Sequence, residues 1–151
     1  MLANYEDKIF PLIVDADFET IYELTTLASI VEKEERNPNE KSTVAGILKK
    51  RLDEGWMIGA DITVCYPFRL TSEQCKFSVT KYLYEKNDYN TRNKRGLPAG
   101  PIGNPSLETF SATLNSKTTP YYFYLHDTTT GKIYYAVTNA QHEKNKRLYL
   151  R

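Results

Sequence analysis

Two stretches of the chain carry apolar residues at the spacing of an amphipathic helix. The first begins after Asp17, a typical N-cap residue, and runs to about Glu35. The second runs from about Thr43 to Glu54 and ends before Gly55, a typical C-cap residue. An apolar stripe on a helix has to be buried against another element, so the pattern predicts two helices that pack into a core. The stripe residues are Ile21, Leu24, Leu27, Ala28 and Val31 in the first helix, and Val44, Ile47, Leu48 and Leu52 in the second.

The rest of the chain predicts short helices and strands, which makes the fold class α+β. Residues 57–68 are rich in Ile, Val and Thr and predict an extended segment, and residues 8–17 give a weaker signal for a short strand. Residues 121–125 and 132–137 predict a β-hairpin with several helices around it. We expect these helices over residues 72–87, from Pro105 with Asn104 as its cap, and after a capping box formed by Thr138 and Gln141, all within one domain spanning residues 1–151.

Residues 96–105 read GLPAGPIGNP, with three glycines and three prolines in ten positions. This composition excludes a helix and a central strand. Proline stiffens a loop and glycine lets a ligand approach the backbone closely. The segment therefore predicts a rigid irregular loop, either a binding wall or a connector.

Composition narrows the classes of function. The 151 residues carry a net charge of +1, which favours neither nucleic acid nor an anionic lipid surface as a partner. The two histidines, His126 and His142, stand far apart, so we expect no metal site, no catalytic triad and no cofactor. Spacing does not show whether Cys65 and Cys75 pair, and we expect free thiols. The 12 tyrosines suit sugar rings, although tyrosine is also favoured in strands.

Three glutamates, Glu32, Glu34 and Glu35, follow the first apolar stripe. On a helical wheel Glu32 and Glu34 lie on opposite flanks of the stripe, and Lys33 points away from it. A carboxyl group on such a flank is half-buried, which raises its pKa towards the range that a general acid needs. The same pattern fits a solvated helix end, and periodicity alone does not say which glutamate matters.

Several segments that are modest signals one by one follow each other along the chain. They are LASIVEKE (27–34), VAGILKKRLDEGW (44–56), ADITVCY (60–66), YNT (89–91), GLPAGPIGNP (96–105) and, after the predicted hairpin, NAQH (139–142). In this order they resemble the catalytic domain of the endolytic murein transglycosylases, the YceG-like family. The resemblance covers roughly residues 19–145, and the combination of IVEKE with a GLPxGPIxNP loop is its most specific part.

This resemblance implies cleavage inside peptidoglycan glycan strands, at the bond from N-acetylmuramic acid to N-acetylglucosamine. The family uses one glutamate and leaves a 1,6-anhydromuramyl end, and Glu32 is the position matched to that glutamate. The resemblance further implies work at the extracytoplasmic face of a bacterial membrane, with cell-wall synthesis proteins as further partners. We expect the family's membrane anchor and outer module to lie outside these residues. The implied substrate-binding residues are Asp61, Thr63, Tyr66, Tyr89, Asn90, Thr91, Leu97, Pro98, Ile102, Asn104 and His142.

The chain departs from the family pattern at several positions, among them Arg92, where a tyrosine is usual. Two other functions therefore stay open. One is a non-catalytic glycan-binding or scaffolding domain with the same fold. The other is a hydrolytic muramidase in which Asp61 activates water. Asp61 and Thr63, two positions apart on an extended segment, are expected to face Glu32 together.

Overall fold

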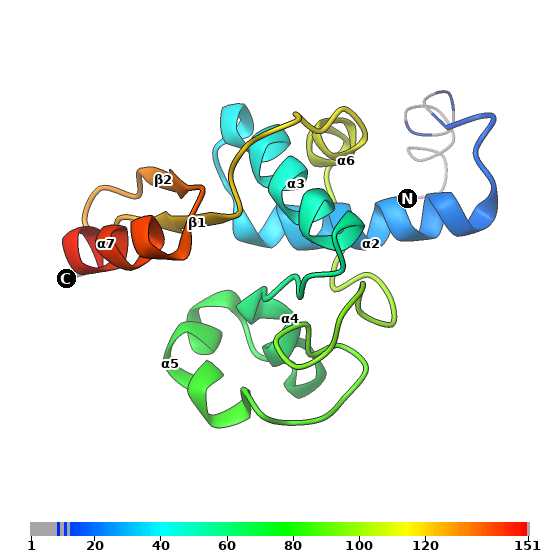
Figure 1. Ribbon diagram of the computed structural model, residues 1–151. Helices are drawn as coiled ribbons and strands as arrows, with labels where there is room; N and C mark the ends of the chain where they lie inside the picture. Colours follow the sequence, from blue (N-terminus) through cyan, green and yellow to red (C-terminus); the bar gives the residue numbers. More distant parts are fainter. Residues whose placement is uncertain (1–8, 10, 12, 151) are drawn as a thin grey trace.

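The computed structural model describes residues 9, 11 and 13–150 of the chain and has the predicted α+β class. Figure 1 shows the long helix α2 running through the molecule, with the hairpin and α7 near its end and a separate group around α4 and α5 below it. None of the helices in the described ranges is long and apolar enough to cross a bilayer. The elements are α2 (Phe18–Glu34), α3 (Pro38–Asp53), α4 (Asp61–Cys65), the 3₁₀ turn η2 (Tyr66–Phe68), α5 (Ser72–Tyr82), α6 (Leu107–Leu114), β1 (Phe123–His126), β2 (Ile133–Ala136) and α7 (Asn139–Tyr149).

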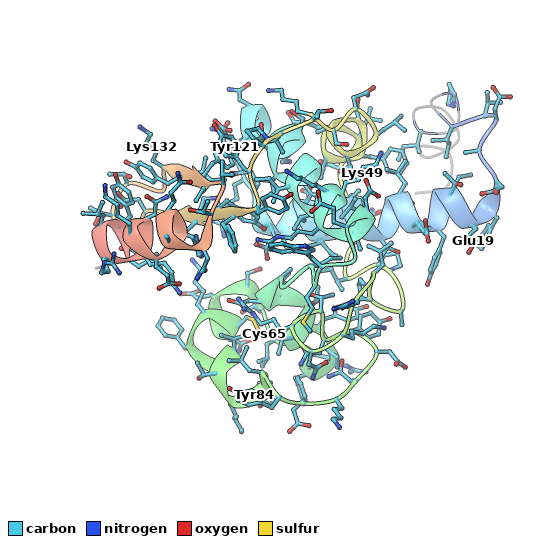
Figure 2. All side chains as sticks on the ribbon, in the orientation of Figure 1. Glu19, Lys49, Cys65, Tyr84, Tyr121 and Lys132 are labelled. Atoms are coloured by element: carbon cyan, nitrogen blue, oxygen red, sulfur yellow. A yellow bond between two sulfur atoms is a disulfide. The ribbon has the colours of Figure 1, made fainter. Side chains whose placement is uncertain are left out.

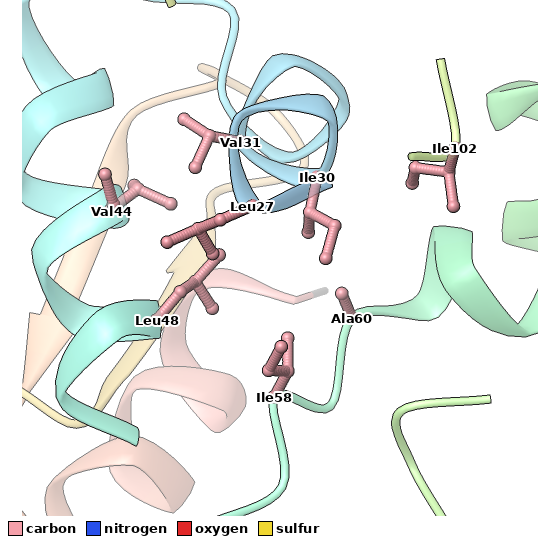
Figure 3. Packing of buried hydrophobic residues seen from close by; sticks show 9 residues of the cluster. Leu27, Ile30, Val31, Val44, Leu48, Ile58, Ala60 and Ile102 are labelled. Atoms are coloured by element: carbon pink, nitrogen blue, oxygen red, sulfur yellow. The ribbon is translucent and has the colours of Figure 1, made fainter. Parts of the chain in front are cut away.

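The core forms where α2, α3 and α6 pack against one another. The predicted stripes meet here, because Leu27 and Val31 of α2 face Val44 and Leu48 of α3 (Figure 3). Ile30 lies on another face of α2 and points towards the segment that leads into α4 (Figure 3). The end of α2 is therefore fixed against both the second helix and the chain that follows it.

The helix boundaries follow the capping residues. Asp17 caps α2 as predicted, and its carboxylate accepts a hydrogen bond of 2.8 Å from the Thr20 N–H. Helix α3 starts earlier than predicted, since Asn37 caps it and Pro38 occupies its first turn. The prediction that Asn104 caps the next helix is wrong, because Ser106 caps α6.

The extended segment predicted over residues 57–68 is wrong from Asp61 onwards, where α4 and η2 form instead. The side-chain oxygen of Thr91 accepts from the Ala60 N–H at 3.1 Å and so satisfies a free donor at the start of α4. Free thiols were also the wrong expectation, because Cys65 and Cys75 form a disulfide that joins α4 to α5 (Figure 2). The hydrogen bond between Ala60 and Thr91, which lies 31 positions further along the chain, thus overrides the local preference for a strand.

The hairpin and the last helix form as predicted. Strands β1 and β2 pair antiparallel, with Leu125 opposite Tyr134, and α7 packs on both strands. Thr138 and Gln141 make the predicted capping box at the start of α7. The weaker strand signal over residues 8–17 falls partly outside the described residues, and the positions that are described there form no strand.

The glycine–proline loop is irregular, as predicted, and is tied to α2 at two points. The Tyr22 hydroxyl donates to the Ala99 carbonyl at 2.8 Å, and the Ile102 N–H donates to the Ser29 hydroxyl at 2.9 Å. The loop therefore holds a fixed position along the helix that carries the glutamates.

Candidate active site

The three glutamates at the end of α2 have different surroundings. Glu35 is only 4% exposed, and its carboxylate contacts His126 Nε2 at 3.0 Å and accepts from the Asn37 N–H at 2.7 Å. Burial alone would raise the pKa of Glu35, but the hydrogen bonds and the charge of His126 outweigh it and lower the pKa. Glu35 therefore joins the hairpin to the turn between α2 and α3.

Glu32 faces α3 and α6. One of its carboxylate oxygens accepts from the Ser106 hydroxyl at 2.9 Å and from the Thr109 hydroxyl, and lies 3.5 Å from Lys41 Nζ. Burial favours a higher pKa for Glu32, but these hydrogen bonds and the Lys41 charge together lower it. The carboxyl group predicted to be the general acid is thus held ionised in a contact between three helices.

Glu34 lies on the other flank of α2 and lines a cavity of about 460 Å³. Its carboxylate accepts a hydrogen bond of 2.9 Å from the Tyr124 hydroxyl of β1. Burial raises the pKa of Glu34, the charge of Asp61 raises it further, and the Tyr124 hydrogen bond and the charges of His126 and Arg92 only partly oppose this rise. Glu34 is therefore the one of these three glutamates whose pKa is raised.

The cavity lies between the end of α2, the segment before α4, the hairpin and α7. Its volume is in the usual range for small-molecule sites, roughly 300–1,000 Å³. The exposed ring of Trp56 and the ring of Phe123 supply flat apolar surface, which suits the C–H faces of sugars. The charged and polar lining residues are Glu34, Arg51, Asp61, Arg92, Tyr124, His126, Asn139, His142, Glu143 and Lys146.

Asp61 opens α4 and lines the same cavity as Glu34, whereas Glu32 is not among the lining residues. The Asp61 carboxylate is half-exposed and forms an ion pair with Arg92. The expectation that Asp61 and Thr63 share one face is wrong, because the segment is helical and Thr63 is fully buried. Asp61 therefore shares the cavity with Glu34, and Thr63 does not line it.

Three predicted binding residues are buried supports of this arrangement. The hydroxyls of Thr63 and Thr91 are 2.8 Å apart, and Thr63 also donates to the Ala60 carbonyl at 2.7 Å. The side-chain amide of Asn90 donates to the carbonyls of Leu83 and Glu85 at 3.0 and 2.9 Å. The bonds of Thr63 and Thr91 fix the start of α4, and with it the position of Asp61, whereas those of Asn90 fix the turn after α5 that precedes Thr91.

Of the remaining predicted binding residues, His142 lines the cavity and the others do not. His142 lines the cavity, its ring stacks on Phe123 with centroids 5.1 Å apart, and its Nδ1 is buried without a hydrogen-bond partner among the described residues. Burial and the nearby Lys146 lower the pKa of His142, which favours the neutral imidazole. The residues that do not line the cavity are Tyr66, Tyr89, Leu97, Pro98, Ile102 and Asn104.

Sequence reasoning missed Tyr124 and Arg51 as parts of the site. Arg51 Nε donates to the Tyr122 carbonyl at 2.8 Å, so its guanidinium holds β1 beside the cavity. The two glutamates follow different neighbours, which only the structure reveals. Glu34 lies one helical turn after Ile30, whose side chain faces the segment before α4 (Figure 3). Glu32 lies one turn after Ala28, which packs with Phe110 of α6.

Comparison with known proteins places the chain in a family. The model of the YceG-like family matches residues 1–148, so the chain belongs to that family. It is 28% identical over 149 residues to the endolytic murein transglycosylase of Streptococcus pneumoniae strain D39, and 27% identical over 131 residues to that of Bacillus subtilis. These matches cover 96% and 87% of this chain but only 27% and 35% of the relatives.

A solved structure resembles the fold. The crystal structure of a YceG-like protein from Listeria monocytogenes aligns with a TM-score of 0.75 at 28% identity. The alignment covers 95% of this chain and 44% of the Listeria chain. The chain therefore corresponds to a part of its longer relatives.

Proposed function

We propose that this chain is the catalytic part of an endolytic murein transglycosylase, with Glu34 as its single acid and base. The scissile bond is the β-1,4 link from N-acetylmuramic acid to N-acetylglucosamine. The observation that carries the proposal is the half-buried Glu34 carboxyl, which has a raised pKa and lies in a cavity with aromatic walls. The names of the relatives supply the substrate class.

The chemistry needs one proton donor that later becomes a proton acceptor. Protonated Glu34 gives its proton to the glycosidic oxygen as the bond to the anomeric carbon breaks. The resulting carboxylate then takes the proton of the muramic acid 6-hydroxyl, whose oxygen bonds to the anomeric carbon. The products are a 1,6-anhydromuramyl end and a free N-acetylglucosamine 4-hydroxyl, and Glu34 is protonated again.

Internal attack by the 6-hydroxyl suits a site with one free carboxyl group. The hydroxyl is part of the reacting sugar, so it acts with the large effective concentration of a positioned group. Water would need its own base. The candidate is Asp61, which lines the same cavity, but its carboxylate is paired with Arg92. This pairing favours the transglycosylase over the muramidase.

The choice of Glu34 over Glu32 rests on their partners. A general acid has to be protonated near the working pH, and the Lys41 charge and two hydroxyl donors oppose protonation of Glu32. Tyr124 also donates to Glu34, but burial dominates there. We assign Glu32 to the helix contact and Glu34 to the chemistry.

We also propose the extracytoplasmic face of a bacterial membrane as the place of action, because murein lies there. The disulfide between Cys65 and Cys75 fits that oxidising surrounding. Cell-wall synthesis proteins remain the expected further partners.

The test is digestion of purified glycan strands, followed by mass spectrometry of the fragments. We expect internal cuts with anhydro ends, each lighter by one water than a hydrolysed end. Glu34→Gln should lower the rate by roughly 10²–10⁴-fold, and Glu32→Gln, assayed on folded protein, should keep most of it. Reducing muramic acid ends would support the muramidase instead. Binding to strands without any fragments would support a scaffolding domain.

A further inference from the structure

A second cavity of about 460 Å³ lies on another side of α2, between α4, η2, the start of α5 and the glycine–proline loop. Its walls are largely apolar, with Ile62, Leu70 and Ile102 among them. Its only charged residues within the described chain are Lys33 and Arg69, and no carboxylate lines it. The full lining is Lys33, Ile62, Tyr66, Pro67, Arg69, Leu70, Thr71, Ser72 and Ile102.

The two cations are not neutralised by the protein. Both are exposed, and neither forms an ion pair with any residue that the structure describes. The Glu34 cavity is different, because carboxylates line it and two of its cations, Arg92 and Lys146, pair with Asp61 and Glu143. A concave surface with uncompensated positive charge attracts an anionic group, and the apolar walls suit a ligand that also carries methyl groups.

The two cavities adjoin across the contact between α2 and α4. Helix α2 contributes Lys33 to this cavity and Glu34 to the other, and α4 contributes Ile62 and Asp61 in the same way. A helix with its side chains is roughly 10–12 Å wide, and an extended peptide spans at most roughly 3.3–3.6 Å per residue. A short peptide that follows the surface over this contact can therefore extend from one cavity towards the other.

We propose that this second cavity binds the peptide stem of the murein substrate through the free carboxylates of the stem. The inference rests on the proposed function, since it takes the stem to be attached to a muramic acid held beside Glu34. Murein stems are short, rich in alanine and acidic. Their methyl groups match the apolar walls, and their carboxylates match Lys33 and Arg69. A bare phosphate would leave the apolar walls uncovered.

The test measures binding separately from cleavage. The probe is a synthetic stem tetrapeptide with free carboxylates, titrated into the 151-residue protein and followed by NMR or calorimetry. The variant is Lys33→Gln with Arg69→Asn. Asparagine is chosen because Arg69 has a φ of 55°, a left-handed conformation that asparagine tolerates. The matched control, Lys49→Gln with Lys86→Gln, removes two exposed lysines that line neither cavity.

We expect the variant to bind the tetrapeptide about tenfold more weakly and the control to bind it as the unchanged protein does. A tetrapeptide with amidated carboxyl groups should lose a similar factor. Equal binding by the variant, or by the amidated peptide, would overturn the proposal. So would displacement of the peptide by inorganic phosphate at the same concentration, since any anion would then suffice.

Cleavage assays keep this proposal distinct from the proposed function. Strands with stems should be cut faster than strands whose stems an amidase has removed, and the Lys33/Arg69 variant should lose that preference. Cutting without any stem preference refutes the inference and leaves the transglycosylase intact. If no strand is cut but the peptide binds at Lys33 and Arg69, the proposed function fails and the peptide site stands.

Discussion

Glu32→Gln is expected to destabilise the protein without abolishing the chemistry. The reason is Lys41, which is only 5% exposed and whose Nζ lies 3.5 Å from Glu32, 3.7 Å from Glu108 and 2.6 Å from the Thr109 hydroxyl. Glutamine keeps the size of the side chain and removes its charge. The ammonium group then stays buried with one weaker, more exposed carboxylate partner.

The expected cost is about 2 kcal/mol. Removal of one partner of a fully buried ion pair costs roughly 3–5 kcal/mol, and the Glu32 side chain is 28% exposed with Glu108 still present, which reduces the loss. For a chain of 151 residues this corresponds to a fall in Tm of about 4–8 °C. The pKa of Glu32 is lowered in the folded state. Its stabilisation is therefore present above the unfolded-state pKa and lost as the pH falls through the folded-state pKa.

Urea unfolding of Glu32→Gln, Lys41→Met and the double variant measures this coupling directly. The double variant should lose less than the sum of the two single variants, because it no longer buries a lone ammonium group. Glu34→Gln is the matched control, since it makes the same change two residues away. A Glu32→Gln protein with unchanged stability and no cleavage would refute the reasoning, and Glu32 would then be the acid.

The remaining predictions concern stability. Burial raises the pKa of Glu34, so the ionised carboxylate lowers the stability of the folded protein at a pH above the unfolded-state pKa. Glu34→Gln should therefore be at least as stable as the original protein at pH 7 in urea unfolding, and any gain should disappear in acid. Lower stability of the variant at pH 7 would contradict this. Reducing the Cys65–Cys75 disulfide, which closes a loop of 10 positions, should lower the free energy of unfolding by up to about 3 kcal/mol in urea titrations; an unchanged midpoint would show that the bond adds nothing. Gly46→Ala should cost about 1–3 kcal/mol in the same assay, because its Cβ would lie 1.9 Å from the Lys117 carbonyl oxygen, and a neutral effect would mean that the loop yields freely.

Local signals predicted α2, the hairpin and α7 well. Asp17 and Thr138 form hydrogen bonds with residues three positions away, so the information that starts each helix lies within one turn of sequence. The apolar stripe of α2 likewise needs only its own spacing to be recognised. These features depend on short stretches of sequence and can be predicted without knowing which distant residues the helix contacts.

The segment that carries Asp61 could not be predicted in this way. Its Ile, Val and Thr residues favour a strand, but α4 is a five-residue helix held by Thr91 and by a disulfide to Cys75. Neither contact can be read from the spacing of the segment itself. The pairing of Cys65 with Cys75 depends on α4 and α5 lying side by side, which the spacing of the two cysteines does not show.

A helical wheel could not decide between Glu32 and Glu34 either, because the deciding contacts also come from distant parts of the chain. Periodicity correctly placed Glu32 and Glu34 on opposite flanks, but the pKa of a flank carboxyl depends on what faces it. Ser106 and Thr109, which face Glu32, lie 74 and 77 positions along the chain, and Tyr124, which faces Glu34, lies 90 positions along it. On the first flank the hydrogen bonds from Thr109 and Ser106, helped to a smaller extent by the charge of Lys41, lower the pKa of Glu32. On the second flank burial raises the pKa of the Glu34 carboxyl group and the negative charge of Asp61 raises it further, which favours the protonated form that the proposed mechanism needs.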